Sequence, residues 1–227
     1  MKKFGLGLDG CENGIEALLK QHVEFIKSDV YNLIEIGSAG CVTLRAMKDI
    51  VSEKQEKWKI AGFDLPNGWS LDWVEINKVF DNKPKILKQD DLDNGKTLNE
   101  NEMTLFLLED PRKFLKEEWK TQLDFVFIDG CHGKCAADDF LAIEDKVKVG
   151  GIVMFHDFAF IDQGRDFQPH CQEMINVRKH LKDIGLYDTR EVNKTPFRDG
   201  WRFIAEIQGS RYWGGGGNSC GVFQKTK

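Results

Sequence analysis

Short apolar runs alternate with longer amphipathic segments over the first two thirds of the chain. Residues 15–26 carry an apolar residue at every third or fourth position, which predicts a helix. The short runs, bounded by Gly, Asn and Asp, predict strands. The predicted strands span residues 32–36, 59–63, 85–89, 124–128 and 151–155; helices are predicted at 42–52, 71–80, about 105–119 with Pro111 interrupting it, and 136–149. This alternation predicts an α/β fold with a doubly wound, mostly parallel sheet.

The last third of the chain has a different pattern. A polar loop is followed by a predicted helix at 174–181 and by two strands at 189–193 and 201–207, which together suggest an antiparallel hairpin at the sheet edge. The prediction is therefore a seven-stranded sheet. The run of glycines from Gly214 to Gly217 predicts a flexible tail. We expect an N-terminal arm and helix over residues 1–30, one domain over 31–210 and a glycine-rich tail over 211–227.

Two of the predicted strands end in an aspartate. Residues 124–128 lead into Asp129, residues 151–155 lead into His156 and Asp157, and one predicted helix lies between them. Such a βαβ unit brings the ends of its parallel strands to one carboxyl edge, where open α/β sheets bind ligands. Neighbouring strands lie about 4.8 Å apart. Asp129 and Asp157 are therefore candidates to share a metal ion, although a strand-end aspartate is also a common helix cap.

Two glycine-rich segments compete for the role of a ligand-binding turn. Residues 5–10 match G-x-G-x-x-G, but only residues 1–4 precede them, so we interpret the segment as a flexible arm. Residues 35–40, Glu-Ile-Gly-Ser-Ala-Gly, follow a predicted strand and open a predicted helix. A turn in that place lets the backbone approach a ligand beside the N–H groups of a helix start. Asp64, at the end of the next strand, is placed to accept hydrogen bonds from ribose hydroxyls.

The composition narrows the class of protein. The 227 residues suffice for a large core, and 41% hydrophobic with 30% charged residues is ordinary for a soluble domain. A net charge of −5 argues against nonspecific binding of nucleic acid or an anionic membrane. No apolar run approaches the ~20 residues of a membrane span, and the first residues do not look like a signal peptide. We therefore expect a cytoplasmic protein whose six scattered cysteines are reduced thiols.

These motifs resemble the class I S-adenosylmethionine-dependent methyltransferases, and more narrowly the metal-dependent O-methyltransferases that include the catechol and macrolide-sugar enzymes. The similarity spans about residues 30–160. It rests on Glu35-x-Gly37, Asp64, Phe127-Ile128-Asp129-Gly130-x-His132 and Gly150-Gly151 followed by His156-Asp157. One departure is that Gly40 is followed by Cys41 at the position where such families carry their second glycine.

The resemblance implies a Rossmann-like methyltransferase fold and a role for each motif. Asp64 would bind the ribose of S-adenosylmethionine, and Asp90 or Asp91, after the third strand, would lie near its adenine. His132 would be the general base, with a turn-stabilising role as the alternative. The residues implied to bind the amino acid end of S-adenosylmethionine are Glu35, Gly37, Ser38 and Gly40. Asp129 is implied to bind both the cofactor and a metal ion and to take part in catalysis. His156 and Asp157 are implied to be further metal ligands.

The predicted function is O-methylation of a small polar acceptor such as a sugar. Mg²⁺ suits carboxylate ligands, whereas ligation by His156 admits Mn²⁺ or Fe²⁺; His156 can instead donate to nearby backbone. We expect no nucleic-acid or membrane partner, and homo-oligomerisation stays open. The alternatives are an NAD(P)-dependent oxidoreductase and a non-catalytic binding protein that retains the fold.

Overall fold

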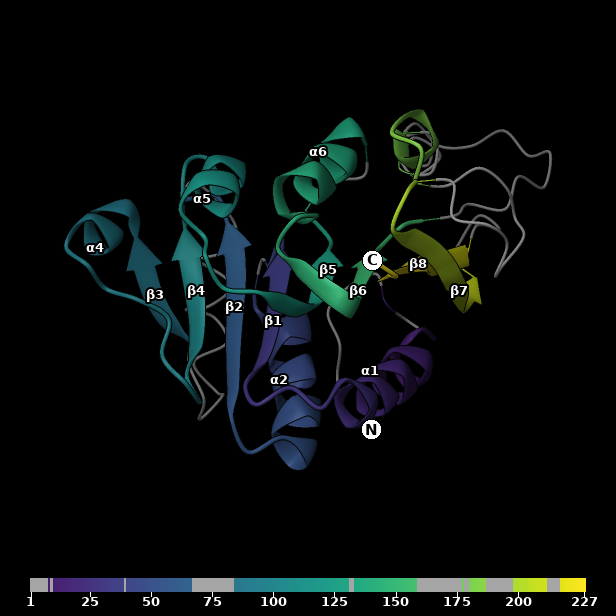
Figure 1. The fold of residues 1–227 in the computed structure, drawn as a ribbon, viewed down its shortest axis with the longest axis horizontal. Coiled ribbons are helices and arrows are strands. Elements are labelled where there is room, and N and C mark those ends of the chain that lie inside the picture. Colours follow the sequence, from purple (N-terminus) through teal and green to yellow (C-terminus); the bar gives the residue numbers. More distant parts are fainter. Residues whose placement is uncertain are drawn as a thin grey trace.

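The strands predicted from the apolar runs lie side by side in one twisted sheet (Figure 1). The structure, a computed structural model, describes residues 8, 10–38, 40–66, 84–130, 133–158, 177, 180–186, 198–211 and 217–227. Its helices and strands are α1 (Glu12–Ile26), β1 (Tyr31–Ile36), α2 (Val42–Lys54), β2 (Trp58–Asp64), β3 (Lys85–Lys88), α4 (Gln89–Asp93), β4 (Met103–Leu107), α5 (Pro111–Glu117), β5 (Leu123–Ile128), α6 (Lys134–Ile143), β6 (Val147–Phe155), β7 (Trp201–Arg211) and β8 (Gly217–Lys225).

The described strands form an eight-stranded sheet with the order β3-β4-β2-β1-β5-β6-β8-β7. Neighbouring strands from β3 to β6 are parallel, whereas β8 runs antiparallel to both β6 and β7. The prediction of an α/β fold with a mostly parallel sheet and an antiparallel C-terminal pair is therefore confirmed. The parallel strands end at one edge of the sheet, so their polar continuations meet there.

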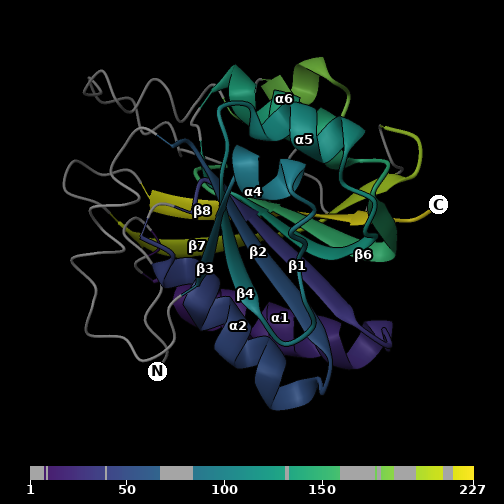
Figure 2. The ribbon, with the colours of Figure 1, turned by 90° about the vertical axis from the view of Figure 1, so that its left-hand side faces the viewer.

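Helices cover both faces of the sheet (Figure 2). α1 and α2 lie on one face, and α4, α5 and α6 lie on the other. Every residue of β1, β4 and β5 is buried, as expected for parallel strands covered on both sides. One apolar cluster includes Phe63, Phe106 and Phe140 on the α5–α6 face, and the other includes Leu33 and Met47 on the α1–α2 face. Within the described part of the chain, no helix is long and apolar enough to cross a bilayer.

The segment from Met103 to Glu117 corrects the prediction of one helix over residues 105–119. Met103–Leu107 is the strand β4, which pairs with β2 and β3, and α5 begins at Pro111 instead of being interrupted there. Proline has no N–H to donate and suits the first turn of a helix. The side chain of Asp110 caps the same turn by accepting from the backbone N–H of Lys113 at 3.0 Å.

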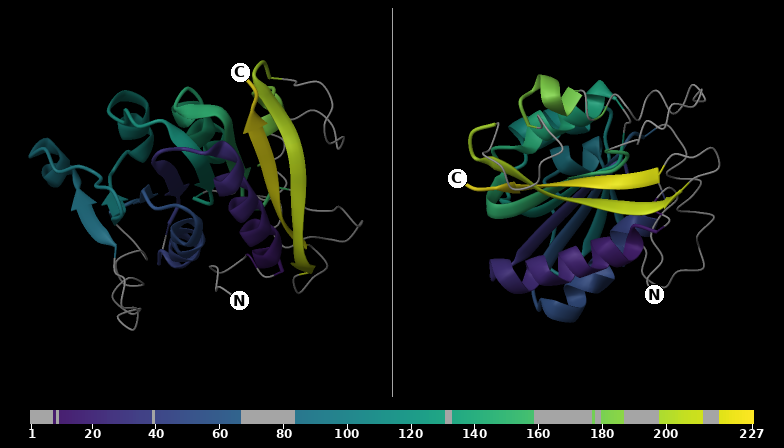
Figure 3. Two further views of the ribbon diagram at one scale, coloured as in Figure 1. Left: turned by 60° about the horizontal axis from the view of Figure 1, so that its bottom comes forward. Right: turned by 90° about the vertical axis from the view of Figure 1, so that its right-hand side faces the viewer.

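The C-terminal residues correct the prediction of a flexible tail over 211–227. Residues 217–225 form β8, which lies between β6 and β7 with Cys220, Val222 and Phe223 buried (Figure 3). A Cβ on Gly221 would come within 2.3 Å of the Phe158 ring, so a glycine is needed where the strand passes this ring. The strand predicted at 189–193 lies outside the described residues. The antiparallel partner of β7 is β8, and the described strands number eight rather than seven.

Two smaller predictions also change. α6 ends at Ile143 and β6 begins at Val147, so the predicted helix over 136–149 is too long and the strand starts earlier than residue 151. Cys135, in the first turn of α6, is disulfide-bonded, so the prediction of reduced thiols is wrong for this residue. Cys11, Cys41 and Cys220 are buried thiols that form no disulfide bond.

Candidate active site

A cavity of about 400 Å³ opens at the carboxyl edge of the central strands. It lies where β1, β2, β4 and β5 end and where α5 begins. Its lining combines apolar, acidic and basic groups from these elements: Ile36, Gly37, Phe63, Asp64, Leu65, Glu109, Asp110, Pro111, Arg112, Gly130 and Asp139. Gly37 and Asp64, both predicted to bind a cofactor, therefore share one cavity.

Gly37 and Gly130 bring two strand ends into close contact at the floor of this cavity. Gly37 has φ +89°, and a Cβ placed on it would lie 2.1 Å from the Cα of Gly130. The backbone N–H of Gly37 donates to the carbonyl of Phe63 at 2.8 Å, and that of Asp129 donates to Ile36 at 2.8 Å. The turn after β1 is thus held on both sides. Glycine is needed there for the approach of the β5 loop as well as for the positive φ.

The departure at Cys41 has a visible backbone consequence. Cys41, just before α2, has φ 57° and ψ 24°, the left-handed conformation that favours glycine. Its side chain is buried, and burial raises the pKa of the Cys41 thiol, so the thiol stays neutral. The turn keeps the conformation that a glycine would adopt, with a cysteine in its place.

Glu35 is buried beneath the turn and does not line the cavity wall. The Ser38 hydroxyl and the backbone N–H of Leu44, in the first turn of α2, lower the pKa of its carboxyl group. The Ser38 hydroxyl also lies 3.2 Å from the Glu35 carbonyl oxygen, so Ser38 holds Glu35 within the turn. Burial, and then the charge of Asp129, raise the pKa of Glu35 well above its usual range. Among the described residues, no group donates to the Glu35 Oε2 atom.

Asp90 and Asp91, the residues predicted to lie near the adenine, are one strand further from Asp64 than the acids that follow β4. Asp90 and Asp91 follow β3, which β4 separates from β2. Asp90 lines a second cavity of about 370 Å³, and Asp91 lines neither cavity, because it accepts from the Lys88 backbone and pairs with Lys96 at 2.6 Å. The contact of Asp90 or Asp91 with the adenine therefore stays a prediction, and the strand beside β2 is β4.

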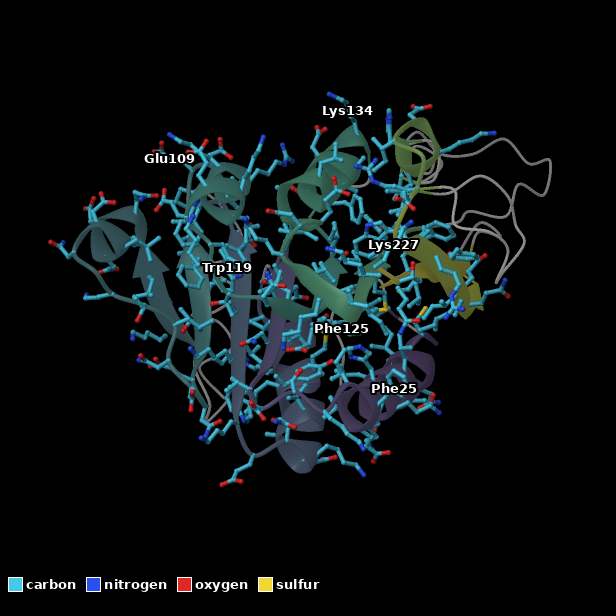
Figure 4. The ribbon with its side chains drawn as sticks, viewed as in Figure 1. Phe25, Glu109, Trp119, Phe125, Lys134 and Lys227 are labelled. Atoms are coloured by element: carbon cyan, nitrogen blue, oxygen red, sulfur yellow. The ribbon has the colours of Figure 1, made fainter. Side chains whose placement is uncertain are left out.

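Glu109 and Asp110, which follow β4, line both cavities. The Asp110 carboxylate caps α5, whereas the Glu109 carboxylate makes no hydrogen bond or ion pair with another described residue. Glu109 lies beside α5 at the carboxyl edge of the sheet (Figure 4). The β4 arrow in Figure 1 ends at this edge. The sequence signal for this pair was the run Met-Thr-Leu-Phe-Leu-Leu before Glu-Asp-Pro, a buried strand ahead of a proline-initiated helix.

Asp129, His156 and Asp157 meet at the neighbouring end of β5 and β6. The pairing of Ile128 with Phe155 sets Asp129 opposite His156, and the His156 backbone N–H donates to the Ile128 carbonyl at 3.0 Å. The His156 Nδ1 atom lies 2.6 Å from Asp129 Oδ1 and 3.3 Å from Asp157 Oδ2. These distances bring the imidazole within ion-pair range of both carboxylates.

The donors are of a kind that suits a divalent cation, with two carboxylates and one imidazole. In the described part of the chain, however, no group of three or more His, Cys, Asp or Glu side chains has an arrangement that holds a metal ion. A cation bound between these donors would require the imidazole and the Asp129 carboxylate to move apart from their 2.6 Å contact. Asp157 has φ 49°, a left-handed backbone that turns its carboxylate toward His156. His132, the predicted base, lies outside the described residues.

Comparison with known proteins assigns the family. Residues 34–158, more than half of the chain, match the sequence family described as a methyltransferase domain. The chain belongs to this family. The match covers the glycine turn, Asp64, Glu109 and the Asp129–His156–Asp157 cluster. The methyltransferase is of class I and depends on S-adenosylmethionine, as its motifs predicted. No curated protein matches the chain in sequence.

Solved structures of methyltransferases share the fold. The O-methyltransferase TomG from Streptomyces achromogenes, solved with S-adenosylmethionine, aligns with a TM-score of 0.56 at 10% identity, over 95% of this chain and 79% of TomG. A Staphylococcus aureus protein proposed to be a caffeoyl-CoA O-methyltransferase aligns at 0.54 and 11% identity, over 93% and 81%. An rRNA methylase from Streptococcus thermophilus aligns at 0.51 and 9%, over 92% and 95%. Identities this low show a common fold and do not identify the acceptor.

The cavity fits S-adenosylmethionine in three respects. Asp64 ends β2 on the cavity wall, where a ribose can donate to its carboxylate. Gly37 and Gly130 leave the floor free of side chains. The Glu35 Oε2 atom is a buried acceptor with no donor among the described residues, and the ammonium of the cofactor's amino acid end is a donor that would also favour its charged form.

Proposed function

We propose that this methyltransferase transfers the methyl group of S-adenosylmethionine to a hydroxyl group of a small polar acceptor, with a sugar as the first choice. The observation that carries the proposal is the cluster of Asp129, His156 and Asp157 directly beside the cofactor cavity, since Gly130 of the cavity wall follows Asp129. Methyl transfer to a hydroxyl requires removal of a proton, and this cluster supplies proton-accepting groups at the end where an acceptor would meet the methyl group.

The residues take separate roles in the proposed reaction. The Asp129 carboxylate accepts a hydrogen bond from the acceptor hydroxyl and orients its oxygen toward the methyl group. His156 fixes the Asp129 carboxylate through the 2.6 Å contact. His132, three residues after Asp129, is the proposed base that takes the hydroxyl proton, which an imidazole does efficiently near neutral pH.

A divalent cation is a further part of the proposal. Asp129, Asp157 and His156 would hold it once the His156–Asp129 contact opens, and when bound it lowers the pKa of an acceptor hydroxyl. The carboxylates favour Mg²⁺, and the imidazole favours Mn²⁺ or Fe²⁺. The structural similarity to O-methyltransferases supports an oxygen atom as the methyl acceptor. The net charge of −5 supports a small acceptor over RNA.

The test measures S-adenosylhomocysteine release with hydroxyl acceptors (sugars, catechol, a caffeoyl thioester) and with ribosomal RNA, each with and without Mg²⁺ or Mn²⁺. Asp157→Asn is the main variant, because asparagine tolerates the left-handed backbone at this position and removes only the charge. Asp138→Asn is the matched control, since Asp138 lies on α6 near Lys134 and outside the cavity.

The expected result is turnover of a small hydroxyl acceptor that Asp157→Asn lowers by about 10²-fold and Asp138→Asn leaves unchanged. Calorimetry on the same proteins measures cofactor and metal binding separately. Transfer to RNA alone contradicts the proposed acceptor class. Full turnover in EDTA, or metal binding that Asp157→Asn leaves intact, contradicts the proposed metal site while leaving the methyltransferase itself standing.

A further inference from the structure

Arg112 and Asp139 face each other across the helix side of the cofactor cavity and line its wall. Arg112 is the second residue of α5, and Asp139 lies in the middle of α6. The two helices lie side by side on the same face of the sheet (Figures 1 and 2). The Nε atom of Arg112 donates to Asp139 Oδ1 at 2.6 Å. This contact ties the β4–α5 unit to the β5–α6 unit above the cavity.

The two side chains are buried to very different extents. Asp139 exposes only 5% of its side chain, whereas Arg112 exposes 44%. Burial raises the pKa of Asp139, and the Arg112 guanidinium opposes that shift and favours the carboxylate. A buried carboxylate that accepts from an arginine edge fixes the plane of the guanidinium. Asp139 therefore acts as an anchor for Arg112.

Arg112 uses only one edge of its guanidinium in this contact. Neither terminal amino group of Arg112 has a partner among the described residues. Arg112 lines the cofactor cavity and also an outer groove between α5 and α6, which Lys116 and Leu141 line as well. A planar cation, fixed at one edge and exposed on the wall of a ligand cavity, is suited to stack on an aromatic ring.

The rest of the cavity indicates which ring. Asp64 is the proposed ribose acceptor, and Leu65, the next residue, is an apolar side chain that is 53% exposed and lines the same cavity. Glu109 lies at the start of α5, on the same side as Arg112. A ribose held at Asp64 therefore places the attached base among Leu65, Glu109 and Arg112.

We propose that Arg112 binds the adenine ring of the cofactor by stacking and that Asp139 is the positioning residue that fixes its guanidinium. The inference rests on S-adenosylmethionine binding in this cavity and assigns two residues that the sequence motifs do not contain. Arg112 then determines affinity for the nucleoside end of the cofactor, while the amino acid end depends on the Glu35–Gly37 turn.

The test titrates adenosine and S-adenosylhomocysteine into the full-length protein by calorimetry. The variants are Arg112→Gln and Asp139→Asn, and Lys116→Gln is the control, because Lys116 is a cation of the same helix outside the cavity. Arg112→Gln is expected to weaken both ligands by the same factor of about five to ten. Asp139→Asn is expected to weaken both by a smaller factor than Arg112→Gln, because the guanidinium stays but is held less firmly, and Lys116→Gln is expected to have no effect. The KM for S-adenosylmethionine should rise in step, with kcat at saturating cofactor unchanged.

The outcomes separate this inference from the proposed function. A wild-type protein that binds neither ligand overturns both. Wild-type binding that Arg112→Gln leaves unchanged overturns the stacking role alone. Loss of S-adenosylhomocysteine binding with normal adenosine binding places Arg112 at the amino acid end and likewise overturns it. Lower thermal stability of Asp139→Asn with unchanged adenosine affinity makes the ion pair purely structural.

Discussion

Replacement of Gly37 by alanine tests whether two strand ends meet at the floor of the cofactor cavity. The new Cβ would lie 2.1 Å from the Cα of Gly130 and 2.3 Å from its nitrogen. Ordinary contact begins at 3.4 Å, so the shortfall at Cα, 3.4 minus 2.1, is 1.3 Å. Both neighbours are backbone atoms of Gly130, which cannot rotate away as a flexible side chain would, and the N–H of the preceding Asp129 donates to the Ile36 carbonyl of β1. The turn and the β5 loop must separate.

Two terms contribute to the loss of unfolding free energy in Gly37→Ala. The φ of +89° costs an L-residue about 1–2 kcal/mol, and forced overpacking costs about 1–3 kcal/mol more. We therefore expect Gly37→Ala to lower the free energy of unfolding by about 2–5 kcal/mol, a large part of the stability of an ordinary domain. Cofactor binding should be lost as well, because the two glycines form the cavity floor.

Gly95 provides the matched control. It has φ +80°, and a Cβ added to it would meet nothing within 4 Å. Gly95→Ala therefore carries only the conformational cost of about 1–2 kcal/mol and should retain cofactor binding. Urea unfolding gives both free energies, and the shift in Tm with S-adenosylhomocysteine reports binding. The reasoning is refuted if Gly37→Ala costs no more than Gly95→Ala, or if it binds cofactor normally.

Three further predictions concern stability. Burial lowers the pKa of His22, so folding favours its neutral ring; stability is full above the unfolded pKa of about 6.5 and falls as the pH drops below it. His22→Gln should flatten the slope of unfolding free energy from about pH 7.5 to about pH 5, and an unchanged slope contradicts this assignment. Asp124 is fully buried and pairs with Lys148 at 2.8 Å. Asp124→Ala should therefore lower the free energy of unfolding, measured in urea, by about 3–5 kcal/mol. A loss under about 1 kcal/mol would mean that water replaces the pair. Cys41 has a left-handed backbone, so Cys41→Val should lower the free energy of unfolding by at least about 2 kcal/mol, whereas Cys41→Gly should stay within about 1 kcal/mol of wild type. Equal losses of unfolding free energy in the two variants would show that backbone strain is not the cause.

Much of the fold could be predicted because hydrophobic periodicity is local. Each apolar run reports a buried segment, so β1, β2, β5 and β6 were placed within a few residues. The sequence also predicted that Asp129 and His156 would lie close together. One crossover helix joins two neighbouring parallel strands, and that connection brings both strand ends to the same edge.

Strand order was decided by the tertiary structure. β4 lies between β3 and β2, and β8 lies between β6 and β7, through pairings between segments distant in the chain. A five-residue apolar run such as Met103–Leu107 reads equally as strand or helix, because periodicity cannot separate the two at that length. Because β4 lies beside β2, Glu109 lines the same cavity as Asp64, whereas Asp90 lines the second cavity.

The sequence by itself determined which residues end the strands at the functional edge and that the chain is an α/β methyltransferase. The tertiary structure decided which of these residues share a cavity, since strand order sets that neighbourhood. It also brought Arg112 and Asp139 together from two helices, a contact without a periodic or motif signature. Local patterns record burial, whereas contacts between helices arise only when long-range pairing has fixed where each helix lies.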